Sequence, residues 1–519
     1  MKTLVMKSIR KFNYIFLTVV FLGSLGCEDL ETINQNNPDR DRVLASGTDL
    51  ISVLNGGYIS WWQAIHDDHP IMALSITSDQ YGVSWGNFAG RRMGEEPRDA
   101  YNNRATESQD YRKMIEDPWF GALSAVSTAN DIINALDGGT SIDNGGDRDQ
   151  STRAAAYLLR GLSNGYLGLM FDVGFRVLET DDVANPLDFV PYTTMIDAAI
   201  EDLDLGISIA QAAGGDFSHE FFNGVSLDKD MFIKLSNSYA ARFLSSWPRT
   251  ESEAAGIDWP AVLSRASQGI DFNFAPEADG SFWFSGQQYQ YRDTGNGDFW
   301  ARVDQRLVAA MDPSQPTRYP EVIAKGEAPL ASPMATSDDA RLLTDFTFEP
   351  EVDFPTDRGE WHFSHYKHSR NISDPTFAGD ATAAGPMPVF RKADNDLLHA
   401  EALLNTGDPS GAVDIINNGT RVTRGGLAPL SSGASADEIN DAIMYEKAIE
   451  LMGTAPFALW LERRRRGPRL AFDQVDALGG LQIGTPAQLP SPAKELDIRV
   501  EASYNFGGVN TDPEGINRF

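Results

Sequence analysis

Helical periodicity recurs along most of this chain, and it limits the possible folds more than any other feature. In residues 152–171 apolar side chains recur at steps of three and four, which places them on one face of a helix. The same spacing occurs in 390–406, after which Gly407, Asp408 and Pro409 end one helix and start the next. In all, the spacing predicts helices over residues 49–65, 119–137, 152–171, 192–212, 228–247, 258–270, 300–311, 390–406, 409–421 and 436–453. The sequence therefore predicts a mostly α fold.

Consecutive helices joined by short turns are typical of tetratricopeptide-like arrays, whose unit is a helix pair. About four pairs are predicted, over residues 119–171, 192–247 and 390–421 and from about 436 onward.

Residues 271–387 lack the helical pattern and are rich in Gly, Pro, Asp and aromatic residues. A long stretch of this kind is usually a functional loop region carried by a rigid scaffold. We therefore predict one domain over 49–519, with a helical scaffold in 49–270 and 388–470 and a ligand-facing, loop-rich insertion with few short strands in 271–387. A second loop is predicted from Ser75 to Arg104.

The first residues have the pattern of an export signal. Basic residues precede an apolar run from Tyr14 to Leu25, which is too short to span a bilayer. Cys27 follows directly and is the only cysteine among 519 residues. A lone thiol in this place is the acceptor in lipoprotein processing, so we predict a signal peptide over 1–26, a lipid anchor on Cys27 and a flexible tether over 27–48. The alternative is an incidental cysteine behind an ordinary signal peptide.

The charge of the chain restricts its partners. Acidic residues outnumber basic ones by 74 to 43, which gives a formal net charge of −31. Nucleic acid is excluded as a partner, because affinity for it depends on Lys and Arg neutralising phosphates. With a single cysteine the chain forms no internal disulfide, so its stability depends on its core.

Several motifs, taken in order, resemble those of the SusD/RagB family of outer-membrane nutrient-binding lipoproteins. They lie at Arg153–Gly174, Met231–Leu244, Pro388–Leu404, Asn417–Leu427, Tyr445–Leu451 and Leu489–Pro492. Asp394, Lys447 and Ala448 depart from the family pattern at positions that look structural.

This resemblance implies a SusD-like fold, in which about four tetratricopeptide-like pairs pack against a loop-rich half. It implies a protein anchored in the outer membrane, facing the cell exterior, that covers a SusC-like TonB-dependent transporter as a lid. It also implies a glycan ligand, or less often a peptide, no cofactor and no catalysis. The residues agree, since they contain no nucleotide loop and no placed pair of nucleophile and base. A tetratricopeptide-like scaffold that binds only other proteins is the alternative.

Two aromatic loops are the candidate ligand site, Ser78–Arg92 and Ser281–Trp300. A sugar ring has an apolar face that stacks on aromatic rings, and hydroxyl edges that bind polar side chains. The alternative is that these aromatic residues anchor the loops on the helical core. The predicted ligand-binding residues are Asp79, Tyr81, Trp85 and Asn87 in the first loop, and Trp283, Tyr289, Tyr291 and Arg292 in the second.

Two further patterns invite a catalytic or metal interpretation. His362, His365 and His368 have a spacing that would align on a helix, but their aromatic neighbours favour an extended segment, in which the middle histidine faces away from the others. Residues 161–165 spell the hydrolase motif GxSxG, but they lie inside a periodic helix, where small residues let two helices approach. We therefore predict no metal site and no hydrolase site here.

The run from Arg463 to Arg466 is unusual in so acidic a chain. Cations suit the C-terminal ends of helices, so a solvated helix end is the favoured interpretation. The alternative is internal pairing with acids such as Glu446 and Glu450.

Overall fold

The computed structural model describes residues 40–83, 89–182, 184–214, 217–286, 301–318, 333–350, 362–370, 384–454, 457–471, 476 and 478–508. The chain divides into two compact units, Met1–Ala45 and Ser46–Phe519. In the first unit the structure describes helix α2 (Arg40–Leu44), so the last part of the expected flexible tether is helical. All further description concerns the second unit.

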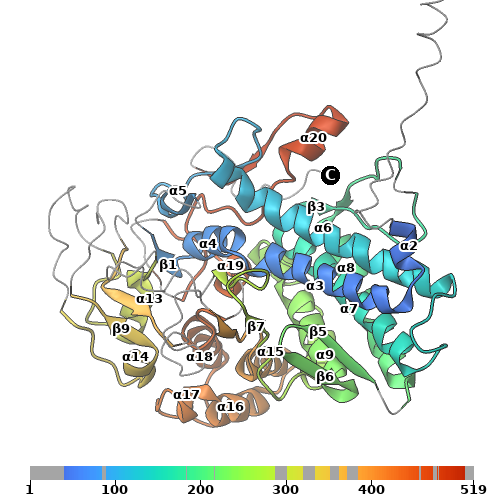
Figure 1. The fold of residues 1–519 in the computed structure, drawn as a ribbon. Coiled ribbons are helices and arrows are strands. Elements are labelled where there is room, and N and C mark those ends of the chain that lie inside the picture. The colour runs from blue at the N-terminus through green and yellow to red at the C-terminus, as the bar shows by residue number, and fades with distance from the viewer. Residues whose placement is uncertain are drawn as a thin grey trace, which may run out of the picture. The chain divides into compact units, whose positions relative to one another are not determined.

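The first half of the second unit is a row of packed helices (Figure 1). Each of these helices contacts the next one in the row. In order they are α3 (Gly47–His66), α6 (Gln109–Asp137), α7 (Asp147–Met170), α8 (Tyr192–Ala212), α9 (Lys229–Ser246) and α11 (Trp259–Ala266). Their apolar stripes form the core, and α7 is buried along almost its whole length.

Glycines on α7 allow this close packing. A Cβ at Gly161 would lie 3.1 Å from the carbonyl oxygen of Ala199 in α8, and one at Gly165 would overlap the ring of Phe243 in α9. The GxSxG sequence therefore lies inside a helix, and its small residues let neighbouring helices approach, as predicted.

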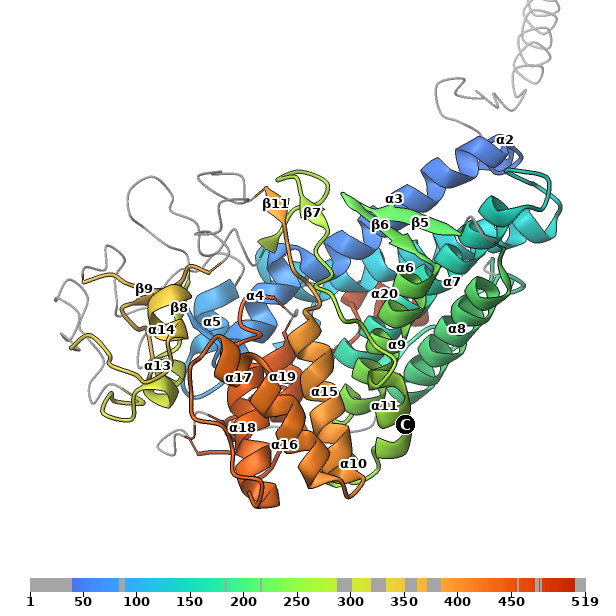
Figure 2. The same ribbon diagram turned by 90° about the horizontal axis from the view of Figure 1, so that it is seen from below.

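The second half begins after the loop-rich region with α15 (Lys392–Asn405), α16 (Pro409–Asn418) and α17 (Thr420–Thr423). They continue into α18 (Ala436–Ile449) and α19 (Ala458–Arg464). A shared apolar cluster joins α15, α16 and α18 and includes Ala400, Ile416 and Ile443. Figure 2 shows these helices beside α9 and α11, and α15 contacts both. The predicted pairs thus correspond to α6–α7, α8–α9, α15–α16 and α18–α19, whose members are in contact.

Strands in the described residues occur as short antiparallel ribbons of two. The pairs are β1 (Tyr81–Gly82) with β8 (Arg302–Val303), β2 (Tyr101–Asn102) with β12 (Asn505–Phe506), β3 (Val173–Gly174) with β4 (Val190–Pro191), β5 (Ser218–Phe222) with β6 (Val225–Asp228), β7 (Glu277–Ala278) with β11 (Gly385–Pro386), and β9 (Phe346–Phe348) with β10 (Tyr366–His368). The fold is therefore mostly helical with few short strands, as predicted.

Several short helices were not predicted. They are α4 (Asp68–Thr77), α5 (Gly90–Gly94), α10 (Glu251–Ala254), α14 (Arg341–Thr344) and α20 (Ala493–Arg499). The helix predicted over 300–311 is shorter than expected, because β8 precedes it and Asp304 caps α13 (Gln305–Met311). Among the helices that the structure describes, none combines the length and the apolar composition needed to cross a bilayer.

Candidate functional site

The ribbon of β1 and β8 joins the two loops that the sequence predicts to bind ligand. Tyr81 pairs with Val303, and Gly82 pairs with Arg302, in antiparallel register. Val83 and Ala301 are therefore neighbours across the ribbon. From these two residues the loops continue into 84–88 and back into 287–300, which lie outside the described residues. Two segments far apart in the sequence, ending at Val83 and beginning at Ala301, thus lie side by side.

The structure describes three of the predicted site residues, Asp79, Tyr81 and Trp283. The other predicted positions lie outside the described ranges, and they are Cys27, Trp85, Asn87, Tyr289, Tyr291 and Arg292.

Asp79 is the centre of a buried ion-pair cluster. Its side chain is 1% exposed, and it ion-pairs with Arg98, with Arg306 at 2.7 Å and with Arg463 at 3.0 Å. Both carboxylate oxygens are used, because Arg98 and Arg306 meet Oδ1 and Arg463 meets Oδ2. In this position Asp79 fixes the first loop to α13 and α19, and it offers no oxygen to a ligand.

Tyr81 is also buried, with 1% of its surface exposed. Burial raises the pKa of the Tyr81 phenol, so the ring and its hydroxyl remain neutral. The burial of Tyr81 and Asp79 means that the described part of the first loop supports the ribbon.

A second polar cluster holds the opposite strand of the ribbon. The amide of Asp304 donates to the carbonyl of Gln80, and that of Gln305 donates to the carbonyl of His362. The His362 ring contacts the Glu96 carboxylate at 2.7 Å. The Arg318 guanidinium contacts the same carboxylate at 2.8 Å. Burial alone would raise the pKa of Glu96, but His362 and Arg318 outweigh it and hold that pKa to about 2. The ribbon is therefore rigidly supported.

Trp283 and Phe282 mark the start of the second loop and have opposite environments. The Trp283 ring is 6% exposed and lies 5.0 Å from the ring of Trp62 in α3. Phe282 is 64% exposed, although its carbonyl accepts a hydrogen bond from Gln63. The described aromatic ring that faces solvent in this loop is thus Phe282, which the sequence reasoning missed. The available signal for the exposure of Phe282 was its position directly before Trp283. Because the Trp283 ring packs against Trp62 of α3, its neighbour in the chain faces solvent.

Comparisons with known proteins show what the chain is similar to. Residues 270–455 match the model of the SusD family. Over these residues the sequence is similar to the SusD family. No sequence among curated proteins matches the chain.

Solved structures extend the SusD-like fold to most of the chain. A SusD superfamily protein from Bacteroides vulgatus superposes with a TM-score of 0.59 at 12% identity, over 88% of this chain and 98% of its own. One from Bacteroides thetaiotaomicron gives 0.56 at 13% identity, over 87% and 98%. A SusD-like carbohydrate binding protein from Bacteroides vulgatus gives 0.52 at 14% identity, over 91% and 96%. At these identities the likeness establishes the fold.

The motif acids of the SusD family region form buried ion pairs. Arg341 contacts Glu446 at 2.7 Å and Glu450 at 3.2 Å. Lys447, which departs from the family pattern, contacts Glu401 at 2.6 Å. Asp394, another departure, pairs with Arg242 of α9. These positions are structural, as the sequence comparison with the family suggested.

The prediction of a solvated end for the arginine run was wrong. Within this SusD-like fold Arg463 reaches Asp79, while Arg464 donates to the carbonyls of Leu169 and Ser246 at 2.6 and 2.7 Å. Arg465 contacts Glu401 and Glu462, each at 2.6 Å. Internal pairing is therefore the correct interpretation, but the acids are not the Glu446 and Glu450 that we expected.

The three histidines of the SusD family region have separate partners. His362 contacts Glu96, His365 bonds the carbonyl of Glu349 at 3.0 Å, and the buried His368 ring lies 5.3 Å from the ring of Phe346. His368 ends strand β10, so this part of the segment is extended as predicted. Within the described residues no three His, Cys, Asp or Glu side chains are grouped to hold a metal ion.

Proposed function

We propose that this chain is a cell-surface lipoprotein that binds an oligosaccharide and passes it to a SusC-like TonB-dependent transporter in the outer membrane. The lipid on Cys27 anchors it there, facing the cell exterior. It binds its ligand without catalysing a reaction on it.

The observation that carries this proposal is the pairing of β1 with β8. This ribbon supports both aromatic loops at one place, so side chains of the two loops can bind one ligand together. The residues we propose for this are Trp85 and Asn87 of the first loop, and Tyr289, Tyr291 and Arg292 of the second. A preformed support of this kind lowers the entropy lost when a ligand binds. Phe282, exposed at the base of the second loop, adds a further ring for stacking.

Two other observations support the proposal. The matched solved structures include a SusD-like carbohydrate binding protein. The net charge of −31 favours a neutral or cationic ligand over a polyanionic one. A neutral oligosaccharide that stacks on aromatic rings fits both.

A glycan array tests the proposal on the purified protein, followed by calorimetry on each hit. We expect Trp85→Ala and Phe282→Ala each to weaken binding of the hit by about tenfold, a loss of about 1.4 kcal/mol, because the apolar face of the sugar loses an aromatic ring. Leu343→Ala is the matched control, since Leu343 is an apolar side chain that is 83% exposed on α14.

The outcomes separate the alternatives. Loss of binding in both loop variants but not in the control supports glycan capture by these loops. A clean array from folded protein would contradict it. A hit that survives both loop variants would place glycan binding elsewhere on the chain.

A further inference from the structure

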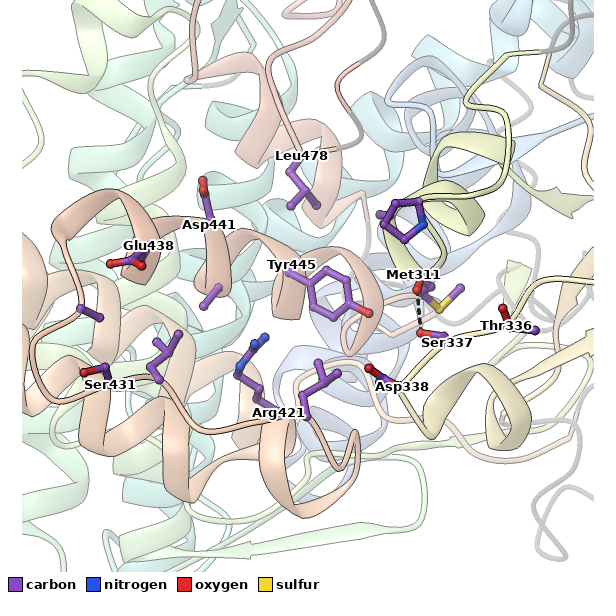
Figure 3. Close-up of a pocket in the computed structure, with 16 residues that line it drawn as sticks. Met311, Thr336, Ser337, Asp338, Arg421, Ser431, Glu438, Asp441, Tyr445 and Leu478 are labelled. Carbon is purple, nitrogen blue, oxygen red and sulfur yellow. Dashed lines mark hydrogen bonds between the residues drawn. The ribbon is translucent and has the colours of Figure 1, made fainter.

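A second site is formed by a pocket of about 720 Å³ to which the β1–β8 ribbon contributes no lining residue (Figure 3). The end of α13, residues 336–338, Arg421 of α17, the segment 427–434 and the exposed side of α18 line it. This volume is within the ~300–1,000 Å³ typical of small-ligand pockets.

Arg421 gives the pocket its chemistry. No residue that the structure describes forms a hydrogen bond or ion pair with its side chain, although its Nε atom is buried. Its neighbours differ, because Arg341 binds Glu446 and Arg424 binds Glu450 at 2.6 Å. In Figure 3 the Arg421 guanidinium points toward the side of the pocket where Tyr445 lies. A guanidinium that has no anionic partner within the described part of so acidic a protein is suited to a carboxylate from outside.

Carboxylates line the same pocket. Asp338 and Asp441 are exposed, and neither side chain accepts a hydrogen bond from a residue in the described ranges. Glu438 is already engaged by Ser435 in the capping box of α18. In Figure 3 Asp441 and Asp338 lie on opposite sides of the pocket, so each carboxylate is a separate position for an ammonium group.

The remaining walls are apolar. Met311, Leu427, Leu430 and Leu478 line the pocket together with the ring of Tyr445. Branched and unbranched aliphatic side chains make a surface for apolar side chains, whereas sugar rings stack best on flat aromatic rings.

We propose that this pocket binds a short peptide that carries both a free carboxylate and an ammonium group. Arg421 pairs with the carboxylate, Asp441 takes the ammonium group, and Leu427 and Leu430 contact the apolar side chains between them. An acidic polysaccharide would bring repeated negative charges against the acidic wall. This proposal does not depend on the proposed glycan function, because the two sites share no residue.

Calorimetry of the full-length protein with three synthetic tripeptides tests the proposal. The first is N-acetylated Leu-Leu-Lys with a free C-terminus, the second is its C-terminal amide, and the third is the first with norleucine in place of lysine. We expect the free peptide to bind, and amidation to weaken it by about tenfold or more, because a charge-assisted hydrogen bond is lost. Arg421→Gln should weaken the free peptide by the same factor and should no longer distinguish it from the amide.

Arg148→Gln is the matched control, since Arg148 is an exposed arginine of α7 that does not line the pocket. Asp441→Asn is the second variant, and it is expected to remove the preference for lysine over norleucine. If thermal melting shows that Arg421→Gln does not fold, Asp441→Asn tests the proposal in its place. Trp85→Ala should leave peptide binding unchanged, which separates this site from the glycan loops.

Three results would overturn the proposal. The first is no binding of any of the peptides to wild-type protein. The second is equal binding of the free peptide and its amide to wild-type protein. The third is binding of maltotriose that Arg421→Gln abolishes, which would make the pocket a saccharide site.

Discussion

Phe282 and Trp283 are adjacent aromatic residues, but replacing each with alanine should change the free energy of unfolding by different amounts. Trp283 packs on Trp62, so Trp283→Ala is expected to lower the free energy of unfolding by about 3–5 kcal/mol. Phe282 is 64% exposed, so Phe282→Ala should change it by less than about 0.5 kcal/mol. Urea unfolding of both variants measures the difference. Equal losses would contradict the environments described for the two rings.

Asp79 is a second residue whose removal has a defined consequence. Three arginines surround its buried carboxylate, and Asp79→Ala leaves them without a common anion. Breaking a buried pair from one side costs about 3–5 kcal/mol, and urea unfolding is expected to show a loss of that size. Asp497→Ala, at an exposed position on α20, is the control. A loss no larger than that of the control would refute the structural role of Asp79.

At the scale of the element, two helical glycines distinguish the effect of side-chain packing on stability from the effect of helix propensity. Gly165 of α7 has no room for a Cβ against Phe243, so Gly165→Ala should destabilise the protein by about 1–3 kcal/mol through overpacking. Gly56 of α3 has nothing within 4 Å of the Cβ position, so Gly56→Ala should stabilise it by about 0.5–1 kcal/mol. Thermal melts of both variants check the prediction, which fails if the two shifts in Tm have the same sign.

The elements also show how far sequence reasoning reached. Periodicity predicted α8 with its observed bounds, Tyr192–Ala212, because one face is apolar and the other polar. It missed α4, since Asp68–Thr77 is short and lies almost wholly in the interior, where no alternation marks a face. It also began α6 too late, because the helix continues through Pro118 back to Gln109. Local pattern therefore predicts long amphipathic helices and misses short buried ones.

The candidate site was predicted less completely than the helices. Composition identified both aromatic loops, but the pairing of Tyr81 with Val303 is a contact between distant segments that no local pattern reveals. The burial of Trp283 depends likewise on Trp62, which belongs to another helix. Which aromatic ring meets solvent is decided by tertiary packing, so composition predicts the loop but not the residue.

At the scale of the whole molecule, buried arginines connect the loops to the helical scaffold. Arg341 links α14 to α18, and Arg463 links α19 to Asp79. Arg464 links α19 to the ends of α7 and α9 through the carbonyls of Leu169 and Ser246. The chain thus places several of its few cations inside, where each one joins distant segments. Because these cations lie in the interior, the acidic residues that exceed them, which give the chain its net charge of −31, are left for the surface.

Buried histidines should make the whole molecule sensitive to acid. Burial lowers the pKa of His66, His219 and His368 to about 3 each, from an ordinary value of 6.5. The unfolded chain therefore binds more protons than the folded one below pH 6.5, so stability is present above pH 6.5 and falls as the pH drops toward 3. The expected loss is about 2 kcal/mol per histidine by pH 5, a large part of the ~5–15 kcal/mol that stabilises a typical protein. Urea unfolding at pH 8, 7, 6 and 5 measures this slope. A free energy of unfolding that stays constant from pH 7 to pH 5 would show that these rings are not buried in the neutral form.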